Sequence, residues 1–135
     1  MVKIRFRRVG LKRQPSYRIV VMDSRKSRDG GFIEIIGNHN PRTRPEVNVI
    51  KEDRALYWLS VGAQPTDAVR RVLERLGTLA RYERMTKGES LEALVAESQA
   101  AQSTAPVSYK TSFPSPAAGE SWIKAREAAK GGSGE

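Results

Sequence analysis

Lysine and arginine side chains crowd the first 28 residues, and the chemistry they offer is phosphate binding. Arginine suits phosphate because its planar guanidinium donates two hydrogen bonds at once and keeps its charge in any ordinary buffer. The ten cations of this stretch, opposed only by Asp23, are Lys3, Arg5, Arg7, Arg8, Lys12, Arg13, Arg18, Arg25, Lys26 and Arg28. A solvated charged surface is the simpler reading, but so many charges of one sign favour a surface that binds a polyanion.

The excess positive charge is confined to one part of the chain. The 135 residues carry a net charge of +9, and the sequence pI is about 10.3. Residues 1–81 hold 18 Lys and Arg against 8 Asp and Glu, a net of +10, whereas residues 82–135 hold 6 against 7, a net of −1. A general need for solubility does not require this asymmetry, so nucleic acid is the first expected partner and an acidic membrane the second.

Four acids among the cations allow a different chemistry. Carboxylates bind Mg²⁺, so Asp23, Asp29, Glu34 and Asp53 are the candidates for a nuclease site. Carboxylates close to so many arginines more often form ion pairs that orient them, and Asp23 and Asp29 flank the cations at 25–28. We therefore expect no enzyme activity, no metal and no cofactor.

Other residue types with useful chemistry are few. The chain has no cysteine, which excludes disulfides and thiolate metal sites, and its one histidine, His39, has no partner ligand of the usual kind. We expect His39 in a loop or facing RNA. Tyr57 and Trp58 are candidates for base stacking, but beside Leu56 and Leu59 at least one of them is expected in the core.

Strands must position the cations. Strict alternation over residues 2–6 places Val2, Ile4 and Phe6 on one face and the cations Lys3 and Arg5 on the other, followed by Arg7. Further strands are expected at 17–22, 32–36 and, as a short edge strand, 47–49. Loops are expected around Gly10 and Pro15, over the polar segment 23–31, and over 38–45.

Helices are expected after the strands. Residues 53–61 have an acidic start and end at Gly62. Thr66 is the expected cap of a helix whose apolar stripe is Val69, Val72, Leu73 and Leu76 and which ends at Gly77. Residues 90–101 and 122–130 are expected helices, with an extended linker over 102–120 and a loose glycine-rich end.

This order of elements predicts the fold class α+β, with a small mixed β-sheet and two helices packed on one face. We expect the opposite face to carry the arginines. Residues 1–81 then form a basic RNA-binding domain, and residues 82–135 a C-terminal extension that is partly helical and partly flexible.

RNA is favoured over DNA because the sequence has no zinc-finger spacing, no zipper heptads and no recognition helix after a tight turn. The aromatic strand signature of the RNA-recognition motif is absent too, which leaves phosphate and shape recognition of folded RNA. A membrane-bound protein is the least favoured class, since the helix near Leu91 is flanked by glutamates. No signal peptide or membrane-spanning run is evident, so a soluble, cytoplasmic protein is expected.

Seven segments, in order over about residues 1–80, resemble the bacterial small-subunit ribosomal protein sixteen family. They are Met-Val-Lys-Ile-Arg at 1–5, Arg-x-Gly-x-Lys at 8–12, Pro-x-Tyr-Arg-Ile-Val-Val at 15–21, Asp-Ser-Arg-x-x-Arg-Asp-Gly at 23–30, Phe-Ile-Glu at 32–34 with Gly37, Asn-Pro at 40–41, and Arg-x-x-x-Trp-Leu-Ser-Val-Gly-Ala-Gln-Pro-Thr-Asp at 54–67. Together these segments are highly specific, whereas each alone is weak.

The resemblance implies a structural constituent of the small ribosomal subunit that binds small-subunit ribosomal RNA near its 5′ domain and stabilises its folded form during assembly. The RNA contacts it implies are Lys3, Arg5, Arg8, Lys12, Tyr17, Arg18, Ser24, Arg25 and Arg28. The charge pattern adds Arg7, Arg13, Lys26, Arg42 and Arg44. Neighbouring ribosomal proteins are the other expected partners, with no membrane and no homo-oligomer.

Two positions depart from the family pattern. Gly31 stands where a basic residue is expected, which removes one contact, and His39 stands where an aromatic ring is usual. The resemblance carries no information on residues beyond about Tyr82.

Overall fold

A computed structural model describes residues 1–43 and 46–102. Within them, the sheet has five strands in the order β4-β3-β2-β1-β5. The strands are β1 (Val2–Leu11), β2 (Gln14–Asp23), β3 (Glu34–Asn40), β4 (Val47–Ile50) and β5 (Gln64–Pro65). All pairs are antiparallel except β1 with β5, which is parallel, so the sheet is mixed as expected.

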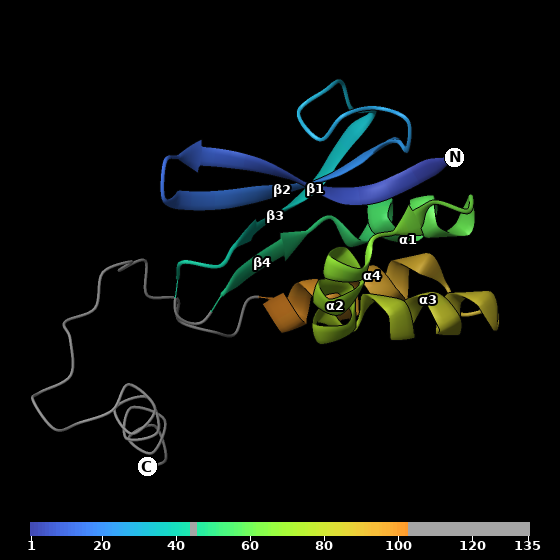
Figure 1. Cartoon of the computed structure of the whole chain (residues 1–135). Helices are drawn as coiled ribbons and strands as arrows, with labels where there is room; N and C mark the ends of the chain where they lie inside the picture. The colour runs from blue at the N-terminus through green and yellow to red at the C-terminus, as the bar shows by residue number, and fades with distance from the viewer. Residues whose placement is uncertain (44–45, 103–135) are drawn as a thin grey trace, which may run out of the picture.

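Four helices follow in the described residues, and they lie on one side of the sheet (Figure 1). They are α1 (Glu52–Ser60), α2 (Asp67–Leu76), α3 (Thr78–Thr86) and α4 (Leu91–Gln102). Their shared core with the sheet includes Ile4, Ile19, Leu59, Val69 and Leu73. The predicted α+β class is therefore confirmed, with four described helices on this side of the sheet where two were expected. None of the described helices has the length and apolar character to span a membrane.

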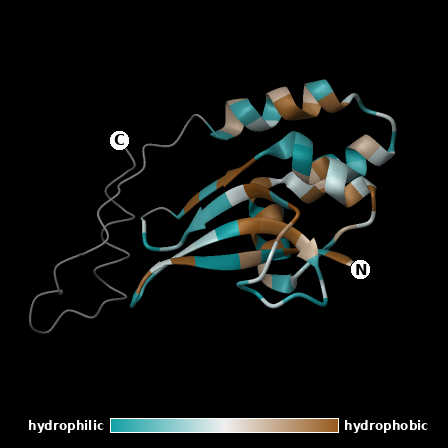
Figure 2. Ribbon diagram, turned by 90° about the horizontal axis from the view of Figure 1, so that it is seen from above, coloured by the Kyte–Doolittle hydropathy of each residue, from teal (hydrophilic) through white to brown (hydrophobic). Residues whose placement is uncertain are grey.

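The hairpin of β1 and β2 is longer than the sequence predicts. The expected loop around Gly10 and Pro15 is wrong, because these two residues are paired partners in the ladder. Pro15 is compatible with a strand here since β3 pairs with β2 only as far as Tyr17, so the missing N–H has no second neighbour to bond. Figure 2 shows hydrophobic and hydrophilic segments alternating along the sheet strands.

The expected loop over 38–45 is also partly wrong. Gly37 does not end a strand, and β3 continues to Asn40 opposite β4. A β-bulge between Ile19 and Val20 shifts the register of β2 and β3 beside Gly37. The alternation of apolar and polar residues is interrupted there, so the sequence pattern does not show that the strand continues. The edge strand predicted at 47–49 is confirmed as β4.

The helix predictions are mostly confirmed. Helix α2 ends at Gly77, whose φ of 77° is left-handed, as expected for a glycine cap. Thr66 is the N-cap residue by position, but its side chain makes no capping hydrogen bond, so that detail is wrong. Helix α3 was not predicted, and residue 82, the expected domain boundary, lies inside it. The expected linker over 102–120, save Gln102 at its start, and the helix at 122–130 lie outside the described residues.

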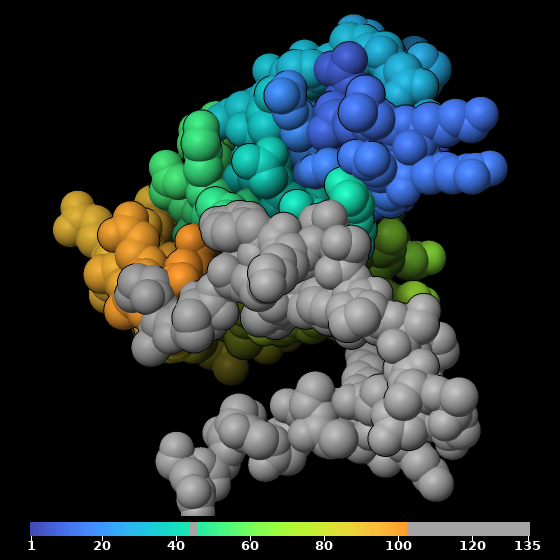
Figure 3. All heavy atoms as spheres, turned by 90° about the vertical axis from the view of Figure 1, so that its left-hand side faces the viewer, coloured from blue at the N-terminus to red at the C-terminus, as the bar shows by residue number. Residues whose placement is uncertain are grey.

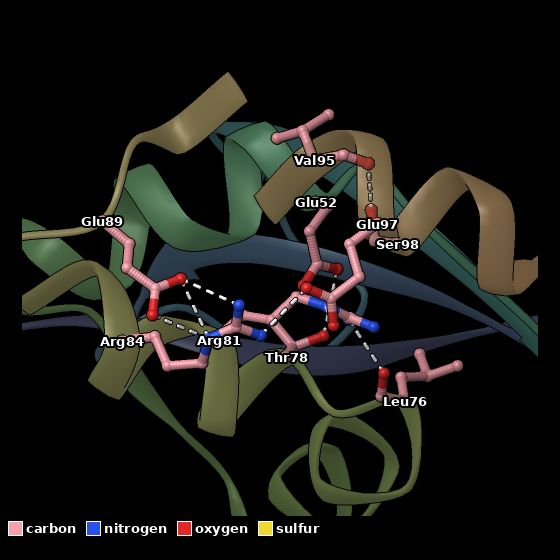
Figure 4. Close-up of polar contacts among 9 residues, drawn as sticks. All are labelled: Glu52, Leu76, Thr78, Arg81, Arg84, Glu89, Val95, Glu97 and Ser98. Atoms are coloured by element: carbon pink, nitrogen blue, oxygen red, sulfur yellow. Dashed lines mark hydrogen bonds and ion pairs between the residues drawn. The ribbon is translucent and has the colours of Figure 1, made fainter. Parts of the chain in front are cut away.

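Helix α4 is held by both apolar and charged contacts. Leu94 and Ser98 are buried, and α4 packs against α1 and α3. Figure 4 shows Arg81 of α3 between Glu52 of α1 and Glu97 of α4. Its Nη1 donates to Glu52 at 3.0 Å, and its Nε lies 3.7 Å from Glu97. The helix expected at 90–101 is thus a packed part of the fold.

Candidate nucleic-acid interface

The β1–β2 hairpin projects past the helices and carries cations at its tip (Figure 1). Leu11 pairs with Gln14, so Lys12 and Arg13 form a two-residue turn, in which Arg13 has a φ of 59°. Both side chains are exposed. Seen from the hairpin's end, long side chains of this blue segment extend from the surface (Figure 3). The tip can therefore reach into a groove or between two strands of a ligand.

The strand register sorts the hairpin cations between two faces. Lys3, Arg5 and Arg7 lie on the face away from the helices, and Arg18 shares it because it pairs with Arg7. Arg8 pairs with Tyr17 on the opposite face, so the expectation that all strand cations share one face is wrong for Arg8. The hairpin therefore carries four cations on one face, Arg8 on the other, and Lys12 and Arg13 at its tip.

Arg7 and Arg18 face each other directly across the two central strands. Like charges in that arrangement are destabilising on their own. An anion bound between or beside them offsets this repulsion. The pair is therefore a candidate phosphate position, defined more specifically than by the net charge.

Residues 24–33, named here the cationic loop, cross the face of the sheet away from the helices (Figure 1). Val20 and Met22 point to that face by register and are fully buried, because the loop covers them. Arg5 Nη1 donates to the Lys26 carbonyl at 3.2 Å. The Arg7 guanidinium lies 5.0 Å from the centre of the Phe32 ring.

The cationic loop presents most of its polar side chains to solvent. Arg25, Lys26 and Arg28 are exposed, whereas Ser24 is half-buried and donates its backbone N–H to the Met1 carbonyl at 2.9 Å. Arg5 and Arg7 both contact this loop, so the structure brings strand and loop cations together. Gly31, the departure from the family pattern, is exposed in the same loop.

The acids of this region are engaged with cations or backbone N–H groups. Asp29 accepts two hydrogen bonds from Arg28, at 3.2 Å each, and these lower the pKa of Asp29. The backbone N–H of Arg25 donates to Asp23 at 2.9 Å and lowers the pKa of Asp23. The predicted orienting pair is thus confirmed for Asp29. Residues 1–43 and 46–102 contain no cluster of three potential metal ligands, and Glu34 is paired with Arg54.

His39 lies in β3 and is 9% exposed, so the expectation of a loop or RNA-facing residue is wrong. Its ring stacks on Phe6, with centroids 5.1 Å apart and planes at 25°, and lies 6.0 Å from the ring of Tyr17. Its Nδ1 makes a hydrogen bond with Asn48 Oδ1. His39 therefore keeps the stacking role of an aromatic ring, and this stack supports Tyr17, an expected RNA contact.

The remaining expected contacts, Arg42 and Arg44, follow β3 in the sequence. Arg42 is half-buried, and its backbone N–H donates to Asn40 Oδ1 at 3.1 Å. Arg44 lies outside the described residues. Nothing in the described part of the chain brings Arg42 into contact with the cationic loop.

The cations of the hairpin and cationic loop differ from those of the helices in how often they form ion pairs. Arg54, Arg75, Arg81 and Arg84 each pair with a glutamate. Among the ten cations of residues 3–28, by contrast, only Arg28 forms an ion pair within the described residues. The sequence could not show the pairing of Arg54, Arg75 and Arg81, because their glutamate partners lie 20 or 29 residues away. Arg70 and Arg71 of α2 are exposed and form no ion pair within the described residues either, but the largest group of unpaired cations lies on the hairpin and loop.

Comparisons of the sequence with known proteins all match one family. The family model described as Ribosomal protein S16 matches residues 8–66. The small ribosomal subunit protein bS16 of Coprothermobacter proteolyticus is 60% identical over 79 residues, which is 58% of this chain and 98% of that protein. The bS16 of Chloroflexus aurantiacus is 61% identical over 79 residues, 58% of this chain and 89% of that protein. The bS16 of Chlorobium phaeobacteroides is 45% identical over 97 residues, 72% of each.

Proposed function

The chain belongs to the ribosomal protein S16 family, and from this premise we propose that its hairpin and cationic loop bind the small-subunit ribosomal RNA. Like the rest of the family, it is a structural component of the small ribosomal subunit and not an enzyme. The observation that supports the proposed interface is the concentration of unpaired positive charge in residues 3–28, where only Arg28 forms an ion pair within the described residues. In the helices, by contrast, Arg54, Arg75, Arg81 and Arg84 are paired with glutamates.

The proposed contacts are the fourteen candidates defined by sequence. Of these, the structure describes thirteen, and all but Arg42 lie on the hairpin or the cationic loop. Arginines on a rigid sheet neutralise phosphates of RNA segments that otherwise repel each other. This lowers the free energy of the compact RNA, which is how the protein stabilises its folded form during assembly.

The domain division follows the same charge pattern. We propose a division by function and not by fold, since α4 packs against α1 and α3. Residues 1–81 bind RNA, whereas residues 82–135 make no broad phosphate contact because their net charge is −1. A monomeric protein of the cytoplasmic ribosome, in contact with neighbouring small-subunit proteins and with no membrane, fits this division.

Salt is the first test of the proposal. Each neutralised phosphate releases counterions, so about six contacts give a slope of roughly −4 to −5 for log K against log[salt]. A filter-binding titration with a transcript of the small-subunit RNA 5′ domain measures this slope. A slope near zero contradicts binding through phosphates.

Substitution of Arg25 and Arg28 by alanine is the second test. Both side chains are exposed, and the Arg28–Asp29 pair is a surface pair of little value to stability. We expect RNA affinity to fall and the salt slope to become shallower by about 1 for each phosphate that is no longer neutralised. The melting temperature, followed by circular dichroism, is expected to stay nearly constant. Unfolding of the variant indicates structural pairs instead of RNA contacts.

A further inference from the structure

Glu34 directly follows the cationic loop, and its side chain is bound by two residues of α1. It is the first residue of β3. Arg54 donates to it from Nε at 2.8 Å and from Nη2 at 2.7 Å, and the Trp58 indole N–H donates at 2.8 Å. A forked guanidinium and an indole N–H together fix the carboxylate in direction as well as distance.

Arg54 is itself held from a second side. Its guanidinium lies 4.6 Å from the centre of the Tyr57 ring, and the Tyr57 and Trp58 rings meet edge to face with centroids 5.5 Å apart. The side chains of Glu34 and Arg54 are 27% and 39% exposed. The cluster therefore lies at the surface, where burial alone does not hold its members in place.

Glu34 is negatively charged and is therefore not suited to contact an RNA phosphate. A carboxylate beside a phosphate-binding loop repels the ligand, so its presence there calls for another role. The loop is already held from β1, where Arg7 lies over Phe32 and Arg5 donates to the Lys26 carbonyl. At the loop's end, the Ile33 N–H donates to the Val21 carbonyl at 2.7 Å, which holds the backbone to β2. The Glu34 side chain adds an attachment to α1.

We propose that Glu34 is a positioning residue, which fixes the end of the cationic loop to Arg54 and Trp58 and so presents Arg25, Lys26 and Arg28 in one geometry. This inference rests on the proposed function of the loop. A loop that is ordered before binding loses less conformational entropy on association, which raises affinity without any new contact.

The substitution Glu34→Gln tests this role. The expected change in RNA affinity is opposite in sign to the change that net charge alone predicts. The substitution raises the net charge by one, which on charge alone strengthens RNA binding. We expect affinity instead to fall about fivefold, equivalent to ordering one or two side chains. The salt slope should stay the same, because every phosphate contact remains. Filter binding with the 5′-domain transcript measures both quantities.

Glu46→Gln is the matched control. Glu46 forms an ion pair with Arg75 of α2 at 2.8 Å, away from the cationic loop, and its replacement changes the net charge equally. We expect its RNA affinity to be unchanged or slightly higher. Arg54→Lys is the second variant, since it keeps the charge but removes the fork, and it should weaken binding as Glu34→Gln does. Circular dichroism checks that each variant is folded.

The outcomes separate this inference from the proposed function. Binding by Glu34→Gln that is as tight as that of the parent, or tighter, overturns the positioning role. So does a slope that changes by about 1, which marks one phosphate fewer at the interface. If Glu34→Gln does not fold, Arg54→Lys decides in the same assay. If the Arg25 and Arg28 variants bind normally, the loop's proposed function fails, whatever Glu34 does.

Discussion

Replacement of Arg81 by methionine should lower the free energy of unfolding by about 3–5 kcal/mol, the cost of leaving a buried charge without its partner. The side chains of Arg81 and Glu52 are 9% and 2% exposed. Glu52 accepts from Arg81 Nη1 at 3.0 Å and from the Thr78 hydroxyl at 3.1 Å. Without Arg81, one hydrogen bond from a neutral hydroxyl is left to compensate a buried carboxylate. Urea unfolding of the full chain measures the loss.

Two further variants give the Arg81 prediction its controls. Arg75→Met breaks the exposed pair with Glu46 and should cost less than about 1 kcal/mol. Addition of Glu52→Gln to Arg81→Met removes the stranded charge, while Thr78 can still donate to the new amide. The double variant should therefore be more stable than Arg81→Met alone. A loss for Arg81→Met no greater than that for Arg75→Met contradicts the role given to the buried pair.

This buried pair also shows which parts of the fold the sequence could not reveal. Glu52 and Arg81 are 29 residues apart, and in sequence Glu52 resembles an ordinary acid in the first turn of a helix. Helices α1 and α2 were predictable because their own residues carry the apolar spacing and the end signals. Strand β5 was missed, since its two residues are a strand only through pairing with β1.

The sequence predicted which types of residue form the candidate site better than it predicted how they are arranged in space. Charge and alternation alone indicated the cations of β1 and of the cationic loop. Arg8 points to the opposite face because β1 continues past it. The strand reaches Leu11, since the turn is formed by Lys12 and Arg13, and is therefore longer than expected. The burial of His39 depends on β3 passing Gly37, which the sequence suggested was an end. Each error follows from tertiary pairing that a local pattern does not contain.

Replacement of Gly37 by alanine tests whether β3 continues past this residue beside β4. We expect the free energy of unfolding to fall by about 3 kcal/mol, at the upper end of the range for overpacking. A Cβ at this position overlaps the Val49 carbonyl oxygen and lies 3.1 Å from Ile50 Cα and 3.3 Å from Ile50 Cγ1. Two of these neighbours are backbone atoms of β4, so no rotamer change relieves the clash. The strands must separate instead, which weakens the pairing of β3 with β4. Urea unfolding measures the change.

Gly31→Ala is the matched control for this substitution. Gly31 is exposed in the cationic loop, and the nearest atom to an added Cβ is the Lys26 ammonium nitrogen at 3.5 Å, at the end of a flexible side chain. The control should change stability by less than about 0.5 kcal/mol, as surface substitutions usually do. An equally small change for Gly37→Ala contradicts the close approach of β4. A large loss at Gly37 alone supports it: glycine is then required within β3 for strand packing, because no other residue lets β4 come so near.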